Sequence, residues 1–180
     1  DRVSMQVAIA VALLPFLYFG LTLSDVIPMR DTGNMLFVGD PLLLKAVAWA
    51  HFGTLPDGYT ISLHGMGFAA WWGMLATALN LMPFGQLDGG HITYALLGRR
   101  ASWVSFVTLA AAMVLTFFSP SLLMTTIMML VMALSLGLHH PRIADEATPL
   151  DPTRRLVAAC SLVIFVVCFT PFPIQTFFGR

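Results

Sequence analysis

Apolar residues fill most of this chain in long runs, and short polar segments separate these runs. Each of the five longest runs lacks charged residues and is close to the ~20 residues that an α-helix needs to cross a hydrocarbon layer. The pattern therefore predicts an all-α fold, a polytopic membrane helix bundle of about five spanning helices in a single membrane domain over residues 1–180. The predicted spans are residues 3–23, 64–82, 101–118, 122–138 and 156–174.

The polar segments predict shorter elements between the spans. Residues 27–30 and 35–38 flank Asp31-Thr32-Gly33-Asn34, which is typical of a tight turn, so a short β-hairpin is expected there. Asp40-Pro41 provides an N-cap and a first-turn proline for a helix over residues 42–52. Because this helix is too short to span a membrane, it is expected to lie in the interface.

The composition supports a membrane protein. Hydrophobic residues make up 58% of the chain and charged residues only 10%, whereas about a quarter of the residues of a globular domain are charged. Membrane lipid is therefore an expected partner for most of the surface. The formal net charge is zero, which gives no electrostatic reason to expect nucleic acid as a partner.

The predicted spans distribute the positive charges unequally between the two sides of the membrane. The side with more Lys and Arg is predicted to be cytoplasmic, and a bacterial inner membrane is the expected location. That side carries Arg2, Arg99, Arg100, Arg142, Arg154 and Arg155, and the other carries Arg30, Lys45 and Arg180.

The cysteines and methionines in the predicted spans are expected to have packing roles. Cys160 and Cys168 match neither a zinc-finger spacing nor a disulfide framework. Met124, Met128 and Met132 fall on one helical face, and a flexible packing stripe is favoured over a soft-metal site, because such a site would be expected to include Cys or His.

The segment of residues 80–91, Asn-Leu-Met-Pro-Phe-Gly-Gln-Leu-Asp-Gly-Gly-His, interrupts the apolar pattern with a proline and three glycines. It contains Asp88, the only acidic residue between Asp57 and Asp145. A carboxylate at membrane depth costs roughly 2.5 to 3.5 kcal/mol unless a partner compensates it, so a functional role is a reasonable default. A structural role competes, since Asp88 could cap a short helix over residues 89–97 that ends at Gly98.

A metal ligand is one chemical role that Asp88 could have. A carboxylate oxygen is a good zinc ligand, and a hydrolytic zinc site uses three protein ligands and leaves a fourth position for water. His91 follows three residues later and could face the same way from one helical turn, which is a weak metal signal. His64 lies at the far end of the preceding predicted span, too many turns away to meet Asp88.

These residues resemble a known family. The pattern Asn80-x-x-Pro83-x-x-x-Leu87-Asp88-Gly89 is similar to the second signature of the site-2 protease family of intramembrane zinc metalloproteases, and the flanking residues look like its bacterial and plastid branch. The resemblance implies that Asp88 is the third zinc ligand and that Asn80 orients the substrate or the developing oxyanion. It also implies a loop shaped by Pro83, Gly85, Leu87, Gly89 and Gly90, and a Zn²⁺ ion that activates water to hydrolyse peptide bonds of membrane-spanning substrates near the cytoplasmic side.

The family's first signature is absent from these 180 residues. A His-Glu-x-x-His helix supplies the other two zinc ligands and the general base in this family, yet Glu146 is the chain's only glutamate and no two of its five histidines are four residues apart. The chain begins with Asp1 and has no signal-peptide pattern, so we expect it to be the C-terminal part of a longer protease and inactive alone. The alternatives are a non-catalytic membrane scaffold or regulatory relative that lost the zinc site, and, more weakly, a transporter with a broken helix.

Overall fold

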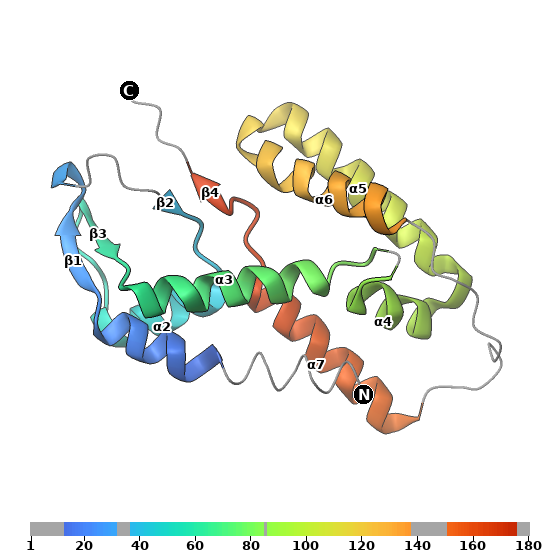
Figure 1. The fold of residues 1–180 in the computed structure, drawn as a ribbon, viewed down its shortest axis with the longest axis horizontal. Coiled ribbons are helices and arrows are strands. Elements are labelled where there is room, and N and C mark those ends of the chain that lie inside the picture. Colours follow the sequence, from blue (N-terminus) through green and yellow to red (C-terminus); the bar gives the residue numbers. More distant parts are fainter. Residues whose placement is uncertain (1–12, 32–36, 85, 138–150, 176–180) are drawn as a thin grey trace.

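Helices form most of the protein in the computed structural model, which describes residues 13–31, 37–84, 86–137 and 151–175 (Figure 1). The predicted helical character is therefore confirmed. The first described helix is Leu13–Thr22. It is followed along the chain by α2 (Leu42–Phe52), α3 (Gly65–Asn80), α4 (Asp88–Leu97), α5 (Ala101–Phe118), α6 (Leu123–Leu136) and α7 (Pro152–Cys168), with single 3-10 turns at η1 (Met29–Asp31), η2 (Gly98–Arg100) and η3 (Pro120–Leu122).

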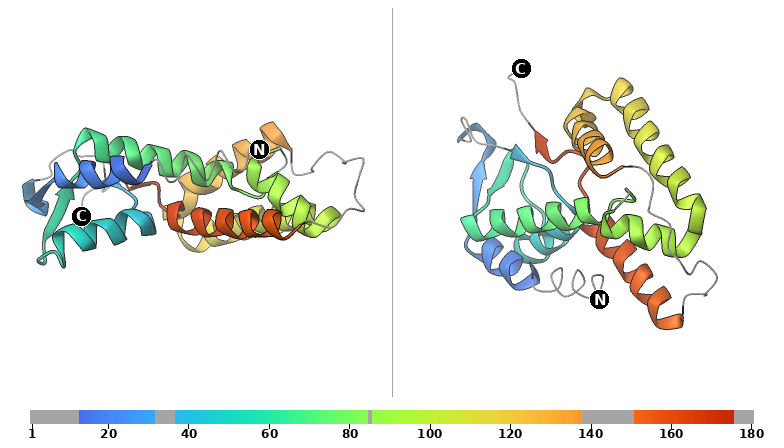
Figure 2. Two further views of the ribbon diagram at one scale, coloured as in Figure 1. Left: turned by 90° about the horizontal axis from the view of Figure 1, so that it is seen from below. Right: turned by 45° about the vertical axis from the view of Figure 1, so that its right-hand side comes forward.

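The arrangement places α3 along the length of the molecule (Figure 1). A β-strand pair lies at the end where α3 begins, and the loop to α4 lies at the end where α3 finishes. Helices α5 and α6 form an antiparallel hairpin above that loop, while α7 crosses below α3. The further views show α7 and α2 on the same side of α3 (Figure 2).

The described helices differ in whether they are long and apolar enough to cross a membrane. By length and composition, one helical run, Asp88–Phe118, is long and apolar enough to cross a membrane. Helix α3 ends at Asn80 and is 16 residues long, which at 1.5 Å per residue gives about 24 Å, short of a hydrocarbon layer of about 30 Å. The structure therefore gives one clear span candidate among the described residues, and it does not establish the five predicted spans. The first part of the predicted span 3–23 lies outside these residues.

The predicted hairpin within residues 27–38 is wrong. Strand β1 (Asp25–Pro28) pairs antiparallel with β3 (Tyr59–Ser62), so that Val26 opposes Ile61. Strand β2 (Phe37–Val38) pairs instead with β4 (Ile174–Gln175) near the other end of the chain. Residues 32–36, which include most of the predicted turn, lie outside the described part.

Two hydrogen bonds of Gly39 account for the pairing of β2 with the sequence-distant strand β4 rather than with β1. Its amide donates to the carbonyl of Pro173 at 3.1 Å, and its carbonyl accepts from the indole N–H of Trp71 at 2.7 Å. Trp71 is fully buried in α3 and stacks on Phe68. These two hydrogen bonds satisfy both backbone groups of a buried residue, and a local turn pattern carries no information about them.

The core lies where the first described helix, α2 and α7 pack around α3. Trp71, Met74 and Ala78 of α3 form it with Leu17, Leu21, Leu44 and Cys168. Gly20 lies directly against Gly67 of α3. A Cβ added to Gly20 would come within 2.3 Å of the Gly67 amide nitrogen. Two facing glycines let the helix backbones touch, as is common between helices in membranes.

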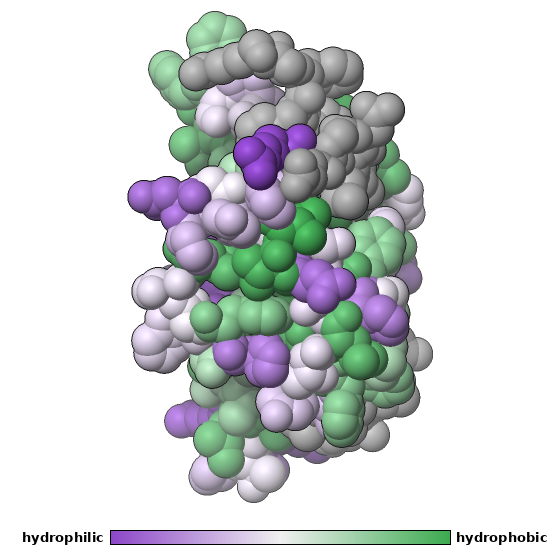
Figure 3. All heavy atoms as spheres, turned by 90° about the vertical axis from the view of Figure 1, so that its left-hand side faces the viewer, coloured by the Kyte–Doolittle hydropathy of each residue, from purple (hydrophilic) through white to green (hydrophobic). Residues whose placement is uncertain are grey.

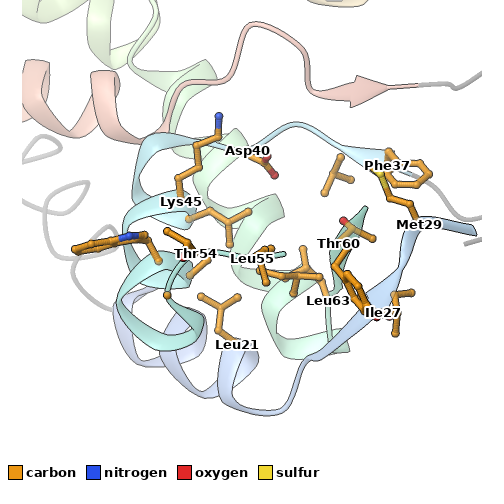
Figure 4. A pocket seen from close by; sticks show the side chains of 18 of the residues that line it. Leu21, Ile27, Met29, Phe37, Asp40, Lys45, Thr54, Leu55, Thr60 and Leu63 are labelled. Carbon is orange, nitrogen blue, oxygen red and sulfur yellow. The ribbon is translucent and has the colours of Figure 1, made fainter. Parts of the chain in front are cut away.

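The end of the molecule around β1 and β3, where α3 begins, mixes hydrophilic and hydrophobic residues on its surface (Figure 3). A cavity of about 820 Å³ opens between this strand pair and α2. Leu21, Leu55 and Leu63 form apolar parts of its wall, and Asp40 and Lys45 lie at its rim (Figure 4). The packing around the Asp40 carboxyl raises its pKa above the usual value, and the Lys45 ammonium opposes this shift.

Candidate functional site

Asn80 is the last residue of α3 and is exposed. The helix ends because the chain turns at Leu81 and approaches Pro83, whose ring disfavours helical backbone in the residue before it. The Leu81 amide still donates to the Thr77 carbonyl at 3.0 Å, and the Met82 amide donates to the Leu79 carbonyl at 3.2 Å. The amide side chain of Asn80 is thus carried by a tightened last turn of a rigid helix.

Asp88 is the first residue of α4 and is half-buried. The prediction that it is the N-cap is wrong by one residue, because Leu87 has the extended backbone of the cap and the helix begins at Asp88. No side-chain hydrogen bond caps this end. A carboxylate in the first turn is still favoured by the helix dipole. The predicted end of this helix at Gly98 is confirmed.

Gly89 brings the start of α4 onto the end of α3. A Cβ at Gly89 would lie 1.9 Å from the Leu81 carbonyl oxygen and 2.5 Å from that of Met82. Only a residue without a side chain allows this approach. Since Leu81 follows Asn80 and Gly89 follows Asp88, the contact brings both predicted site residues to one junction. Gly90 is buried in the same turn.

The loop between these residues is folded on itself and anchored in the core. The Phe84 amide donates to the Met82 carbonyl at 2.8 Å, and the Leu87 amide donates to the Phe84 carbonyl at 2.9 Å. The Phe84 ring is fully buried with Met82 and Leu109, and Leu87 packs against the same cluster. Gly85, another predicted loop residue, lies outside the described part.

Ser105 of α5 joins the loop to the neighbouring helix. Its hydroxyl donates to the carbonyl of Pro83, and its side chain is 3% exposed. Our sequence interpretation did not select Ser105. The available signal was a hydroxyl four residues before Leu109, which places both residues on one helical face, but similar hydroxyls occur throughout these helices.

The histidines are distributed over different parts of the fold. His91 lies one turn into α4, is half-buried, and its amide donates to the Leu87 carbonyl at 3.0 Å. His64 caps the other end of α3, where its Nδ1 accepts from the Met66 amide at 3.3 Å. His51 packs edge-on against Tyr18. The expectation that His64 is too distant to meet Asp88 is therefore confirmed.

The described residues do not fit a complete zinc site. Among them, no three His, Cys, Asp or Glu side chains are grouped closely enough to hold a metal ion. A catalytic zinc needs three protein ligands, and Asp88 with the nearby His91 provides at most two donors. The side chains of the described residues therefore do not assemble a metal centre by themselves.

Comparison with known proteins identifies the family. The model of peptidase family M50 matches residues 45–135, which include α3, the loop and α4. The chain belongs to peptidase family M50, the site-2 protease family. This confirms the predicted resemblance to the site-2 protease family.

Curated relatives of this M50 chain are plant proteins. It is 36% identical over 119 residues to "Probable zinc metalloprotease EGY3, chloroplastic" of Oryza sativa subsp. indica, a match that covers 65% of the chain and 20% of that protein. It is 38% identical over 69 residues to "Probable zinc metalloprotease EGY1, chloroplastic" of Arabidopsis thaliana, which covers 38% of the chain and 12% of that protein. The chain thus spans a fifth or less of the length of these relatives. No solved structure matches it.

Proposed function

We propose that this chain is the C-terminal part of an intramembrane zinc metalloprotease that hydrolyses peptide bonds in or near membrane-spanning segments. The observation that carries the proposal is the backbone contact of Gly89 with Leu81, which holds the ends of α3 and α4 together. It lets an amide, Asn80, and a carboxylate, Asp88, act at one place. Family membership supplies the reaction class.

The roles follow from the chemistry of these side chains. Asp88 contributes one carboxylate ligand to Zn²⁺, the remaining ligands and the general base coming from residues outside this chain. A zinc ion held there would supply an activated water for peptide-bond hydrolysis. The Asn80 amide can donate to a substrate carbonyl or to the oxyanion that develops on it. His91 is a further candidate donor one turn from Asp88.

The helix that carries the remaining zinc ligands could pack on the exposed face of α3. Ala69, Trp72 and Ala76 are exposed along one side of this helix, and Asn80 ends the same side. Small residues let a second helix approach closely. A ligand-bearing helix packed on this face would end beside the junction of α3 and α4.

The membrane arrangement is part of the proposal. Five spans place the Arg-rich side in the cytoplasm, with the loop of residues 81–87 toward that side. The structure is compatible with this arrangement, because η2 and the start of α7, which carry arginines, lie at the end opposite β1 and β3 (Figure 1). The partners are membrane lipid and a transmembrane protein substrate.

Substitution of Asp88 in the full-length protein tests this function. Asp88→Asn keeps the size of the side chain and removes its charge, so we expect loss of stoichiometric zinc and of transmembrane-substrate cleavage with unchanged accumulation in the membrane. Asp57→Asn, in an exposed turn, is the control and should retain both. Failure of Asp88→Asn to accumulate would instead favour a purely structural role for this carboxylate.

A non-catalytic membrane scaffold is the second candidate. It is favoured by the absence of His-Glu-x-x-His from these 180 residues. Metal analysis of the purified full-length protein separates the two functions, because a scaffold would hold no stoichiometric zinc that depends on Asp88.

A further inference from the structure

Ser105 holds its hydroxyl between two possible acceptors. It donates to the Pro83 carbonyl of the loop, and the carbonyl of Ala101 in its own helix lies at 3.3 Å. Serines in helices commonly bond to the carbonyl four residues earlier, as Ser161 does with Val157 at 2.9 Å. At Ser105 the hydroxyl also donates to an acceptor in another element, so it connects α5 to the loop.

The same face of α5 holds the loop by an apolar contact one turn later. Leu109 lies in the cluster with the fully buried Phe84 ring. The residue pair Pro83 and Phe84 is therefore held by Ser105 through a hydrogen bond and by Leu109 through packing. The carbonyl of a residue just past a helix end has no partner within that helix, and at membrane depth it must be satisfied by protein.

We infer that Ser105 is a positioning residue of this site. It fixes the loop that joins Asn80, at the end of α3, to Asp88, at the start of α4, and so sets where the carboxylate stands relative to the amide. This inference rests on the proposed function for its catalytic meaning. Ser105 itself touches neither a substrate nor a metal, and it acts only through the backbone of Pro83.

The experiment measures loop opening and metal binding in the same full-length protein. Ser105→Ala removes the hydroxyl, Ser105→Thr retains one, and Ser161→Ala is the matched control, since Ser161 is equally buried but bonds only within α7. The readouts are amide hydrogen exchange of a peptide that covers residues 81–91 and the affinity for Zn²⁺ alone.

We expect Ser105→Ala to speed exchange in this peptide roughly fivefold, the factor that one lost hydrogen bond of ordinary strength produces. We also expect weaker Zn²⁺ binding, rescue of both readouts by Ser105→Thr, and no change in Ser161→Ala. Equal exchange in Ser105→Ala and Ser161→Ala would overturn the inference. Faster exchange with unchanged Zn²⁺ affinity would overturn the positioning role. A parent protein that binds no Zn²⁺ would refute the proposed function, while the exchange data would still decide whether Ser105 holds the loop.

Discussion

Replacement of Gly89 by alanine separates local helix preference from the packing seen at the α3–α4 junction. Alanine is favoured over glycine inside a helix by about 1 kcal/mol, and it also restricts the unfolded chain. Helix preference alone therefore predicts that Gly89→Ala stabilises the protein. The structure predicts the opposite, because the new Cβ would lie 1.9 Å from a carbonyl oxygen and 2.3 Å from its carbon.

The magnitude follows from the displacement that the clash requires. Ordinary contacts begin near 3.4 Å, so the first turn of α4 or the end of α3 must move by about 1.5 Å, and backbone atoms cannot rotate away as a side chain can. Overpacking of this kind costs about 1–3 kcal/mol or more. After subtraction of the helix preference, we expect a net loss of up to about 2 kcal/mol, which lowers the melting temperature by up to roughly 8 °C for a protein of this size.

Gly65→Ala is the matched control. Gly65 is also in the first turn of a helix, at the start of α3, and a Cβ there would meet nothing within 4 Å. Unfolding of the detergent-solubilised variants, followed by circular dichroism, measures both changes. A Gly89→Ala protein as stable as Gly65→Ala would refute the close approach, and with it the geometric basis of the site.

Three further predictions concern other parts of the fold. Trp71→Phe should lower the free energy of unfolding by about 2 kcal/mol, because it leaves the buried carbonyl of Gly39 without its donor. Trp103→Phe on the exposed face of α5 should change the free energy of unfolding little. Equal effects of the two substitutions in chemical unfolding would argue against the buried hydrogen bond. The pKa of Asp40 is raised in the folded protein, so its charged form is disfavoured there and the free energy of unfolding should fall as pH rises above about 4. Asp40→Asn should reduce this dependence of the unfolding free energy on pH, and an unchanged dependence would contradict the raised pKa. Reporter fusions after Arg100 and after Asp57 should report opposite sides of the membrane, with Arg100 cytoplasmic, and the same side for both would exclude the five-span topology.

Local sequence patterns predicted most of the described helices well. The predicted span 156–174 is wrong at both ends, since α7 begins at Pro152 and ends at Cys168, and Ile174 lies in β4. The predicted span 101–118 and the helix 42–52 match α5 and α2 residue for residue, because apolar runs and proline positions are local signals. The end of α4 at Gly98 is confirmed for the same reason. The predicted second span was two residues too long at its C-terminal end, since α3 stops at Asn80 before the turn toward Pro83.

Local sequence patterns could not predict the contacts between residues that are distant in sequence. The pairing of β2 with β4 depends on an indole in α3 and on a prolyl carbonyl near the other end of the chain, so no local turn sequence could predict it. The residues of the site were selected by family resemblance and by the cost of a buried carboxylate. Ser105 was missed because its partner is a backbone carbonyl, which leaves no trace in residue type.

The hydrogen bonds of Gly39 with Pro173 and Trp71 have a consequence for how the protein can be handled. They attach the final described residues to the middle of the bundle, so cutting the chain after α7 would remove the acceptor for the Gly39 amide. An affinity tag should therefore not replace residues 169–175, and a version shortened after α7 is expected to lose β2 even though every described helix is retained.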